Sequence, residues 1–569
     1  MNASDTTPER KGGARAEATL SPRRLLFRVA AVLLGLSPLV LLEGGLRLFD
    51  LGRPLDTPDP FVGFNRTFPL FERQGAVYRT TRAHAPFIQL QEFPAEKPRN
   101  GYRIFCFGGS TVYGHPYLGD TAFPKWLELE LAATDPTRAW QAVNCGGVSY
   151  ASYRIVPLVQ EALRHQPDLV ILSTGHNEFL EDRTYRALKS RAAWWAWLQG
   201  RINSLHTVAW VRGWWSHGRS TTHQVDAGPA TGDGFSPTVD TRLNSASGYA
   251  AYRRDREWHE RVVAQFDESV RRIVAACQAA RVPILLVRMG SNLRDCPPFK
   301  SEHRAGLAPE READWQAAVD LAAECEKADP ERALRYYREA EAIDGEYALL
   351  HYRMARLLDR LGRAAEALAH FQKARDEDIC PLRILGALER CLQQIAAETG
   401  VPLVDTAALV AARSPEGIPG NDWFVDHVHP NIGGHQLIAR ALADQMRAGG
   451  WVQAGAAWPE DARRETYARH LAALGPAYFA DGRRRVEWLE NWAQRERLAG
   501  EAFPADPRGY ARLGFRRIDL GEDEGAWEVL DEALKRDAGL AEMIRRHARE
   551  LEAEGRADRA AALRSRVEQ

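Results

Sequence analysis

Four polar residues in this chain have the types and settings that acyl transfer through a serine requires. Ser110 follows two glycines at the end of an apolar run, in RIFCFGGST. Asp426 and His429 stand three residues apart in NDWFVDHVHPN, a spacing that lets the carboxylate orient the imidazole while the imidazole takes the hydroxyl proton. Asn177, in STGHNEF, offers an amide that can stabilise an oxyanion. Together they predict nucleophilic attack by Ser110 on an acyl carbonyl.

Each of these residues could also have a purely structural role. A serine after two glycines is typical of a turn or a helix cap. Asp426 could cap a helix, and Asn177 could bond only its own turn. The spacing favours His429 over the neighbouring His427 and His435 as the base.

Short apolar strands precede these residues and determine where their side chains lie. Strands are expected at residues 103–107, 140–143, 168–173, 283–288 and 401–405, with amphipathic helical patterns between them. Strands that alternate with helices predict a doubly wound α/β fold with a parallel sheet. In such folds ligands bind beyond the carboxyl ends of the strands, which is where the polar residues stand.

The segments FGGST, NCGGVS, GHNE and DHVH resemble, in order, the four blocks of the SGNH (GDSL) hydrolase superfamily. The resemblance covers about residues 100–181, 260–300 and 385–447, and it implies a flavodoxin-like sheet. It also implies Ser110 as nucleophile, with Asp426 and His429 completing the triad. The implied oxyanion hole comprises the Ser110 N–H, a block-two glycine assigned to Gly147, and Asn177.

The chain departs from the family pattern in three places. Block one reads Gly-Gly-Ser instead of Gly-Asp-Ser, and block three reads GHNE instead of GxND. In block two the family glycine aligns with Gly147 or falls on Ser149 or Tyr150. The identity of that backbone donor is therefore left open.

Composition excludes several other classes of function. The formal net charge is −1 in 569 residues, so no global field would recruit nucleic acid. The seven cysteines form no CxxC pair and no Cys/His cluster at zinc spacing. We expect no metal and no organic cofactor in the reaction.

The N-terminus predicts a single membrane anchor. Residues 1–22 read as a disordered cytoplasmic tail, and an apolar run at 29–42, extended to 23–49, is long enough to span. Basic residues precede it, and no A-x-A-like cleavage site follows. The catalytic domain is therefore expected outside the cytoplasm, in the periplasm if the cell is Gram-negative.

Two kinds of segment interrupt or extend the hydrolase pattern. A Trp-rich insert at 186–250 could be a packed helical element, a substrate lid or a membrane-surface element. Small residues also recur at a 34-residue spacing, as in tetratricopeptide repeats. The first set is Ala333, Tyr337 and Ala340, then Ala367, Phe371 and Ala374, with Ala355 and Gly362; the second is Gly514, Gly521, Ala526 and Ala533, then Ala548, Gly555 and Ala560.

The predicted layout assigns each segment a role. A tail (1–22) and anchor (23–49) precede a hydrolase domain in two parts (50–300 and 381–450), which flank a tetratricopeptide-like insertion (301–380); a helical connector (451–506) and C-terminal repeats (507–569) follow.

The predicted function is a membrane-anchored ester hydrolase or O-acyltransferase on oxygen esters, with cell-envelope glycans as candidate carriers. A protein partner is expected at the repeats. The alternatives are a lipase or thioesterase acting near the membrane, and a non-catalytic assembly scaffold.

Overall fold

The computed structural model describes most of the chain. The described residues are 69–189, 252–452, 458–494 and 523–567 apart from residues 83, 86 and 554, with short stretches between 34 and 48, 205 and 208, and 511 and 518. The chain divides into two compact units, residues 1–59 with 191–227 and residues 60–190 with 228–569. All the elements described below belong to the second unit.

A five-stranded parallel sheet forms the centre of this unit, in the order β5-β4-β6-β7-β8. The chain passes from β4 outward to β5 and then back across to β6, so the order is that of flavodoxin-like folds. Every strand expected from the sequence is present. The strands are β4 (Gly101–Gly108), β5 (Ala139–Gly146), β6 (Leu169–Ser173), β7 (Ile284–Arg288) and β8 (Leu403–Asp405).

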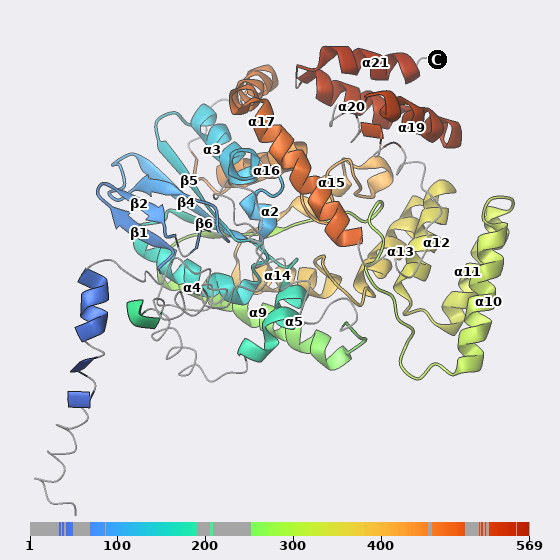
Figure 1. Ribbon diagram of the computed structural model, residues 1–569, viewed down its shortest axis with the longest axis horizontal. Helices are drawn as coiled ribbons and strands as arrows, with labels where there is room; N and C mark the ends of the chain where they lie inside the picture. Colours follow the sequence, from blue (N-terminus) through green and yellow to red (C-terminus); the bar gives the residue numbers. More distant parts are fainter. Residues whose placement is uncertain are drawn as a thin grey trace, which may run out of the picture. The chain divides into compact units, whose positions relative to one another are not determined.

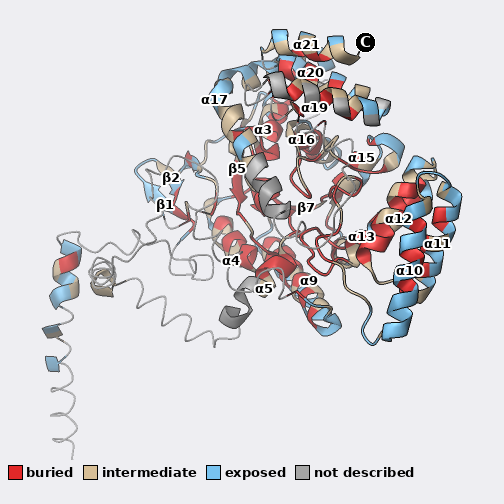
Figure 2. Cartoon of the chain, turned by 45° about the vertical axis from the view of Figure 1, so that its right-hand side comes forward, coloured by how far each residue is buried: buried red, intermediate tan, exposed pale blue. Residues whose placement is uncertain are grey.

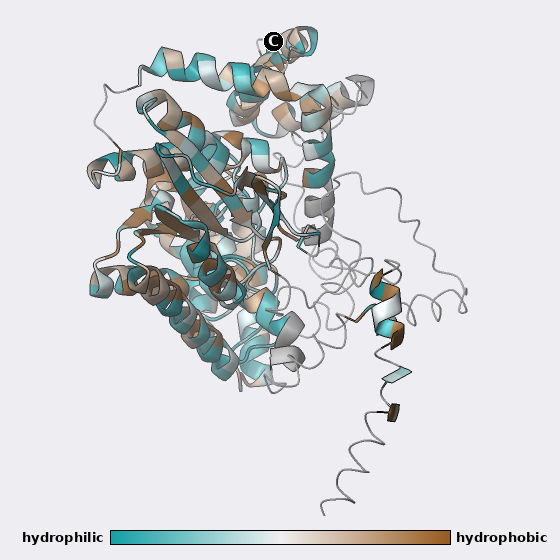
Figure 3. Ribbon diagram, turned by 90° about the vertical axis from the view of Figure 1, so that its left-hand side faces the viewer, coloured by the Kyte–Doolittle hydropathy of each residue, from teal (hydrophilic) through white to brown (hydrophobic). Residues whose placement is uncertain are grey.

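Helices cover both faces of the sheet because its strands are apolar on both sides (Figure 1). Alternate residues of β4 show the division: Ile104 and Cys106 pack into one core, while Phe105 and Phe107 pack into the other. Figure 3 shows the hydrophobic strands between more hydrophilic helices. The first core includes α3 (Phe123–Thr134) and α16 (Ile432–Ala448); the second includes α4 (Ser152–Ala162), α9 (Arg256–Ala279) and α14 (Gly386–Thr399).

A small antiparallel sheet precedes the parallel one and was not expected from the sequence. Its strands pair in the order β1-β2-β3, namely β1 (Phe71–Gln74), β2 (Val77–Thr80) and β3 (Glu92–Pro94). Phe71 and Phe93 pack on Phe105 with ring centroids 6.0 and 5.6 Å away. The strands are too short for a clear alternating pattern, which explains why periodicity missed them.

Two helical hairpins stand between β7 and β8, within the predicted insertion at 301–380 (Figure 2). The recurring small and aromatic residues lie in their interior, since Ala333, Tyr337, Ala340, Ala367 and Phe371 are all buried. Their assignment to tetratricopeptide repeats stays a prediction. The helices are α10 (Pro309–Cys325), α11 (Pro330–Ile343), α12 (Ala348–Arg360) and α13 (Ala364–Asp376).

Further helices follow the hydrolase pattern at the C-terminus. Their small residues Ala526, Ala533, Ala548 and Ala560 are buried in one cluster; Gly521 lies outside the described residues. The helices are α17 (Glu460–Gln494), α19 (Asp523–Arg536), α20 (Ala541–Ala553) and α21 (Ala557–Val567).

Three predicted segments lie largely outside the described residues: the tail at 1–22, the anchor at 23–49 and the Trp-rich insert at 186–250. Among the residues that are described, no helix combines the length and apolar character needed to cross a membrane. The anchor and the role of the Trp-rich insert stay predictions.

A buried ion pair fastens α17 to the sheet-covering helix α3. Glu130 is fully buried, and its carboxylate accepts hydrogen bonds from Arg463 Nε at 2.7 Å and from Tyr467 OH at 2.5 Å. Removing one partner of a buried pair leaves the other charge uncompensated. The long helix α17 is thereby held to the domain that contains the parallel sheet.

We predict that Glu130→Ala lowers the free energy of unfolding by about 3 kcal/mol, because Arg463 stays buried without its main partner. Glu465→Ala on α17 is the control, since Glu465 is exposed and should change stability by about 0.5 kcal/mol or less. Urea denaturation measures both. Equal, small effects would show that the pair does not stabilise the fold.

Candidate active site

Ser110 stands where β4 ends and the short helix α2 (Ser110–Tyr113) begins. Two glycines precede it because there is no room for side chains. A Cβ on Gly108 would lie 2.0 Å from the Ser173 carbonyl oxygen, and one on Gly109 would lie 2.5 Å from Asn177 Nδ2. The Gly-Gly-Ser departure from the family motif therefore has a local cause: the Asn177 amide occupies the space beside residue 109.

The structure brings Ser110, His429 and Asp426 into one hydrogen-bonded chain. Ser110 Oγ is 2.7 Å from His429 Nε2, and His429 Nδ1 is 2.6 Å from Asp426 Oδ2. These contacts span 319 residues of sequence. In this order the imidazole can take the serine proton, and the carboxylate can orient the imidazole and stabilise its positive charge.

The Asp426 carboxylate is buried yet stays ionised. Burial would raise the pKa of this carboxyl, but the charges of His429 and His427 and the hydrogen bonds from His429 hold the pKa well below its usual range. Oδ1 accepts the backbone N–H groups of Val428 at 2.8 Å and His429 at 2.7 Å. A fixed anion on Nδ1 favours the tautomer that leaves Nε2 free to accept the serine proton.

The loop after β7 holds the loop that carries Asp426. Asn292 Nδ2 donates to the Asp426 carbonyl at 3.0 Å, and its backbone N–H donates to the His427 carbonyl at 2.9 Å. Arg294 in the same loop is buried and pairs with Asp359 of α12 at 2.9 Å. Lys300, further along this loop, is also buried, and its Nζ donates to the Tyr252 carbonyl at 2.5 Å.

Asn177 lies beside the serine, as expected. Its Nδ2 is the atom that a Cβ on Gly109 would touch, and it donates to the Tyr150 carbonyl at 3.2 Å. One amide hydrogen is thus used to fix the side chain, and the second is left to donate to a substrate oxygen. Ser110 itself begins α2, so its N–H is among those at a helix start that have no partner within the helix.

The block-two donor differs from the expectation. The Gly147 N–H donates to the Gly108 carbonyl at 3.0 Å, so it is already engaged. Ser149, the alternative position, has φ of 59°, and strained backbone of this kind clusters at functional sites. The Tyr150 N–H is also engaged, because it donates to the Gly147 carbonyl at 3.2 Å. Of the three block-two positions that the sequence left open, Ser149 is therefore the one carried into the proposed mechanism.

Glu178, the last residue of GHNE, has a role that the sequence did not reveal. Its carboxylate accepts the Ser152 N–H and Oγ–H, both at 2.8 Å. An anion at the first turn of α4 suits the positive end of the helix dipole. Glu178 thereby fixes the segment from Gly146 to Ser152 against Asn177.

Three further histidines surround His429, and each is held neutral. Burial is the main cause, and the charge of a neighbouring histidine is the second. Together they lower the pKa of His176 and of His435 to about 3, and they lower the pKa of His115 well below its usual range. The His115 ring lies 5.1 Å from that of His429. His435 lies six residues after His429, whereas His115 and His176 come from the loops after β4 and β6. These three neutral rings pack around the base, whose charged partner is Asp426.

Sequence comparisons find no matching family model and no matching curated protein. Among solved structures, the chain is similar to an acetylxylan esterase from Geobacillus stearothermophilus, with 14% identity, 63% of this chain and 100% of that chain covered, and a TM-score of 0.27. It is also similar to a putative acylhydrolase from Bacteroides fragilis (10% identity, 62% and 90% covered, TM-score 0.26) and to a GDSL-like lipase from Bacteroides thetaiotaomicron (9% identity, 61% and 88% covered, TM-score 0.25).

We predict that Asn177→Ala lowers kcat by about 10²- to 10³-fold, because one oxyanion donor is lost. Gly109→Ala should have a similar effect, since its methyl group would displace the Asn177 amide. Steady-state kinetics on a short p-nitrophenyl ester measure both.

The control is Gly433→Ala near the catalytic loop, where a new Cβ meets only Asn431 Oδ1 at 3.4 Å. We expect its kcat to stay within about twofold of the wild type. A Gly109→Ala enzyme as active as this control would contradict the placement of Asn177.

Proposed function

We propose that this protein is a serine-dependent ester hydrolase or O-acyltransferase of the SGNH type. The single observation that carries the proposal is the chain Ser110–His429–Asp426, with contacts of 2.7 and 2.6 Å at the carboxyl edge of a parallel sheet. The four sequence blocks that resemble the superfamily converge on this edge, which adds support.

The proposed reaction proceeds through an acyl-enzyme. Ser110 Oγ attacks the acyl carbonyl carbon while His429 Nε2 takes the hydroxyl proton. The Ser110 N–H, the Asn177 amide and the Ser149 N–H stabilise the oxyanion. Collapse breaks the ester C–O bond, and His429 returns the proton to the leaving alcohol. A second hydroxyl, from water or from a sugar, then repeats the sequence and releases the acyl group.

The acceptor decides between hydrolysis and transfer, and the substrate is an oxygen ester. Cell-envelope glycans that carry acyl groups are candidates because the predicted topology places the catalytic domain outside the cytoplasm. A lipase or thioesterase is the alternative, favoured by the tryptophans of the 186–250 insert, which lie outside the described residues.

A non-catalytic scaffold is disfavoured by the site itself. Burying a carboxylate costs free energy even when hydrogen bonds stabilise its charge, and a protein without catalytic activity would gain nothing from that cost. We propose that the helical hairpins at 301–380 and the helices at 507–569 recruit a partner, as tetratricopeptide repeats do. The burial of their recurring small residues is consistent with close helix pairing.

We predict that Ser110→Ala or His429→Ala lowers turnover of a short ester by at least about 10³-fold, because the nucleophile or its base is lost. A panel of acetyl and longer acyl esters measures activity, and a fluorophosphonate probe reports the nucleophile. The control is Ser565→Ala at an exposed position on α21.

A folded wild type that hydrolyses no ester in the panel and takes up no probe at Ser110 would overturn the proposed function. Comparing acetyl with longer acyl esters separates the esterase from the lipase alternative.

We also propose a single-pass anchor at 23–49 with the catalytic domain outside the cytoplasm. A reporter fused after residue 60 should be active only outside the cytoplasm, because the basic residues hold the N-terminus inside. A periplasmic phosphatase fusion, with a cytoplasmic reporter at the same point as its control, measures this. Activity of the cytoplasmic reporter alone, or a mature N-terminus near residue 45, would contradict it.

A further inference from the structure

Three side chains with metal-binding chemistry converge in the helical insert. Glu341 lies near the end of α11, His351 in the first turns of α12 and His370 in the middle of α13. One ligand atom from each lies within 4.8 Å of the others. No sequence motif marks this group, because its members come from three helices and match no cysteine or histidine spacing pattern.

The distances match those between ligands of one small cation. The two Nδ1 atoms of His351 and His370 are 3.1 Å apart, and Glu341 Oε1 is 3.8 Å from His351 Nδ1. Two ligand atoms that bind the same tetrahedral Zn²⁺ lie about 3.3–3.5 Å from each other. Small side-chain rotations would bring all three to bonding distance.

The second ring nitrogen of His351 fixes its tautomer. Nε2 is 2.8 Å from the Gly345 carbonyl, so Nε2 carries the hydrogen and Nδ1 presents a lone pair. Metal-bound histidines use this arrangement, in which the other N–H donates to a backbone carbonyl. His351 is fully buried, and its Nδ1 faces Nδ1 of His370 at 3.1 Å.

We propose that Glu341, His351 and His370 bind one divalent cation of the zinc class, with water completing the coordination. Two imidazoles and one carboxylate suit Zn²⁺. Glu341 and His370 are only half-buried, which gives the ion a route from solvent. The site is separate from the ester chemistry and does not rest on it.

Lys373 is a cation beside Glu341, and it opposes metal binding. Its Nζ lies 3.5 Å from Glu341 Oε1, so it competes for the oxygen that would face the ion. Removal of this charge should therefore strengthen metal binding. If the two histidines only contacted each other and bound no metal, removal of the Lys373 charge would change no metal affinity.

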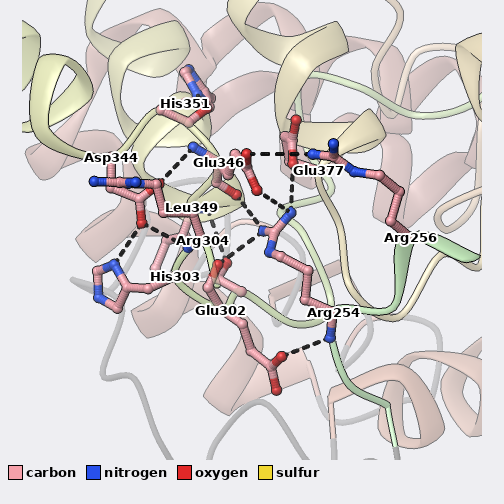
Figure 4. A network of polar contacts seen from close by, with 12 residues as sticks. Arg254, Arg256, Glu302, His303, Arg304, Asp344, Glu346, Leu349, His351 and Glu377 are labelled. Atoms are coloured by element: carbon pink, nitrogen blue, oxygen red, sulfur yellow. Dashed lines mark hydrogen bonds and ion pairs between the residues drawn. The ribbon is translucent and has the colours of Figure 1, made fainter. Parts of the chain in front are cut away.

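A cation here would join the two hairpins, because its ligands come from α11 on one side and from α12 and α13 on the other. The loop between α11 and α12 also contacts the hydrolase domain (Figure 4). The Glu346 carbonyl accepts from Arg254 at 2.6 Å, and the Arg254 guanidinium also pairs with the Glu346 carboxylate at 3.1 Å. The ion would thus stabilise the part of the insert that docks on the domain.

The experiment uses the purified full chain without a histidine tag, stripped of metal with a chelator. Zn²⁺ is titrated in competition with a chromogenic chelator, Co²⁺ absorption reports coordination geometry, and thermal unfolding reports stability. We expect one Zn²⁺ per chain, a tetrahedral Co²⁺ spectrum and a higher Tm with Zn²⁺.

The variants separate a bound ion from a plain side-chain cluster. Glu341→Gln and His370→Ala should weaken Zn²⁺ binding at least about 10- to 100-fold and abolish the Tm increase. Glu339→Gln, exposed on the same helix, should bind as the wild type does, and Lys373→Gln should bind a few-fold more tightly. The proposal is overturned if wild-type affinity matches that of His370→Ala, if the Co²⁺ spectrum is octahedral, or if Lys373→Gln leaves the affinity unchanged.

Discussion

The arrangement of this site depends on keeping the buried carboxylate of Asp426 ionised. Asp426 is withdrawn from water, and its carboxylate persists only because two backbone N–H groups and two histidines surround it. Its position favours the His429 tautomer with hydrogen on Nδ1, so that Nε2 can accept the hydrogen bond from the Ser110 hydroxyl. Residues that contact neither substrate nor serine, such as Asn292, are needed to hold the backbone of Asp426 in place.

The same constraint connects the helical insert to the chemistry. The loop that carries Asn292 is fixed by α12, since Tyr352 OH donates to the Arg294 carbonyl at 2.9 Å and Asp359 pairs with the Arg294 guanidinium. The insert enters between the last two strands of the sheet, next to the residues it supports. It is a structural extension of the active-site loops as well as a surface of its own.

The convergence of Ser110, Asp426 and His429, the proposed triad, could be predicted from the sequence because each follows a strand, and the order of the strands brings their ends together. The five strands were found because buried parallel strands are continuous apolar runs. Local spacing could not reveal the Ser149 conformation, the Glu178 cap, the histidines around His429 or the β1–β3 sheet. The Glu178 cap depends on a contact with a separate segment, at Ser152. The β1–β3 strands are instead too short to show a periodic pattern. The sequence shows that Gly109 stands where the SGNH pattern has an aspartate. The steric reason for this glycine became clear only from the position of the Asn177 amide in the structure.

The distance along the chain between nucleophile and base has a consequence during synthesis. Ser110 and His429 are separated by 319 residues, and ribosomes add about 5–20 residues per second. The serine therefore emerges roughly a quarter of a minute to a minute before the base that activates it. Until His429 is made, Ser110 lacks the imidazole that we propose as its base, so a nascent chain carries an unactivated hydroxyl.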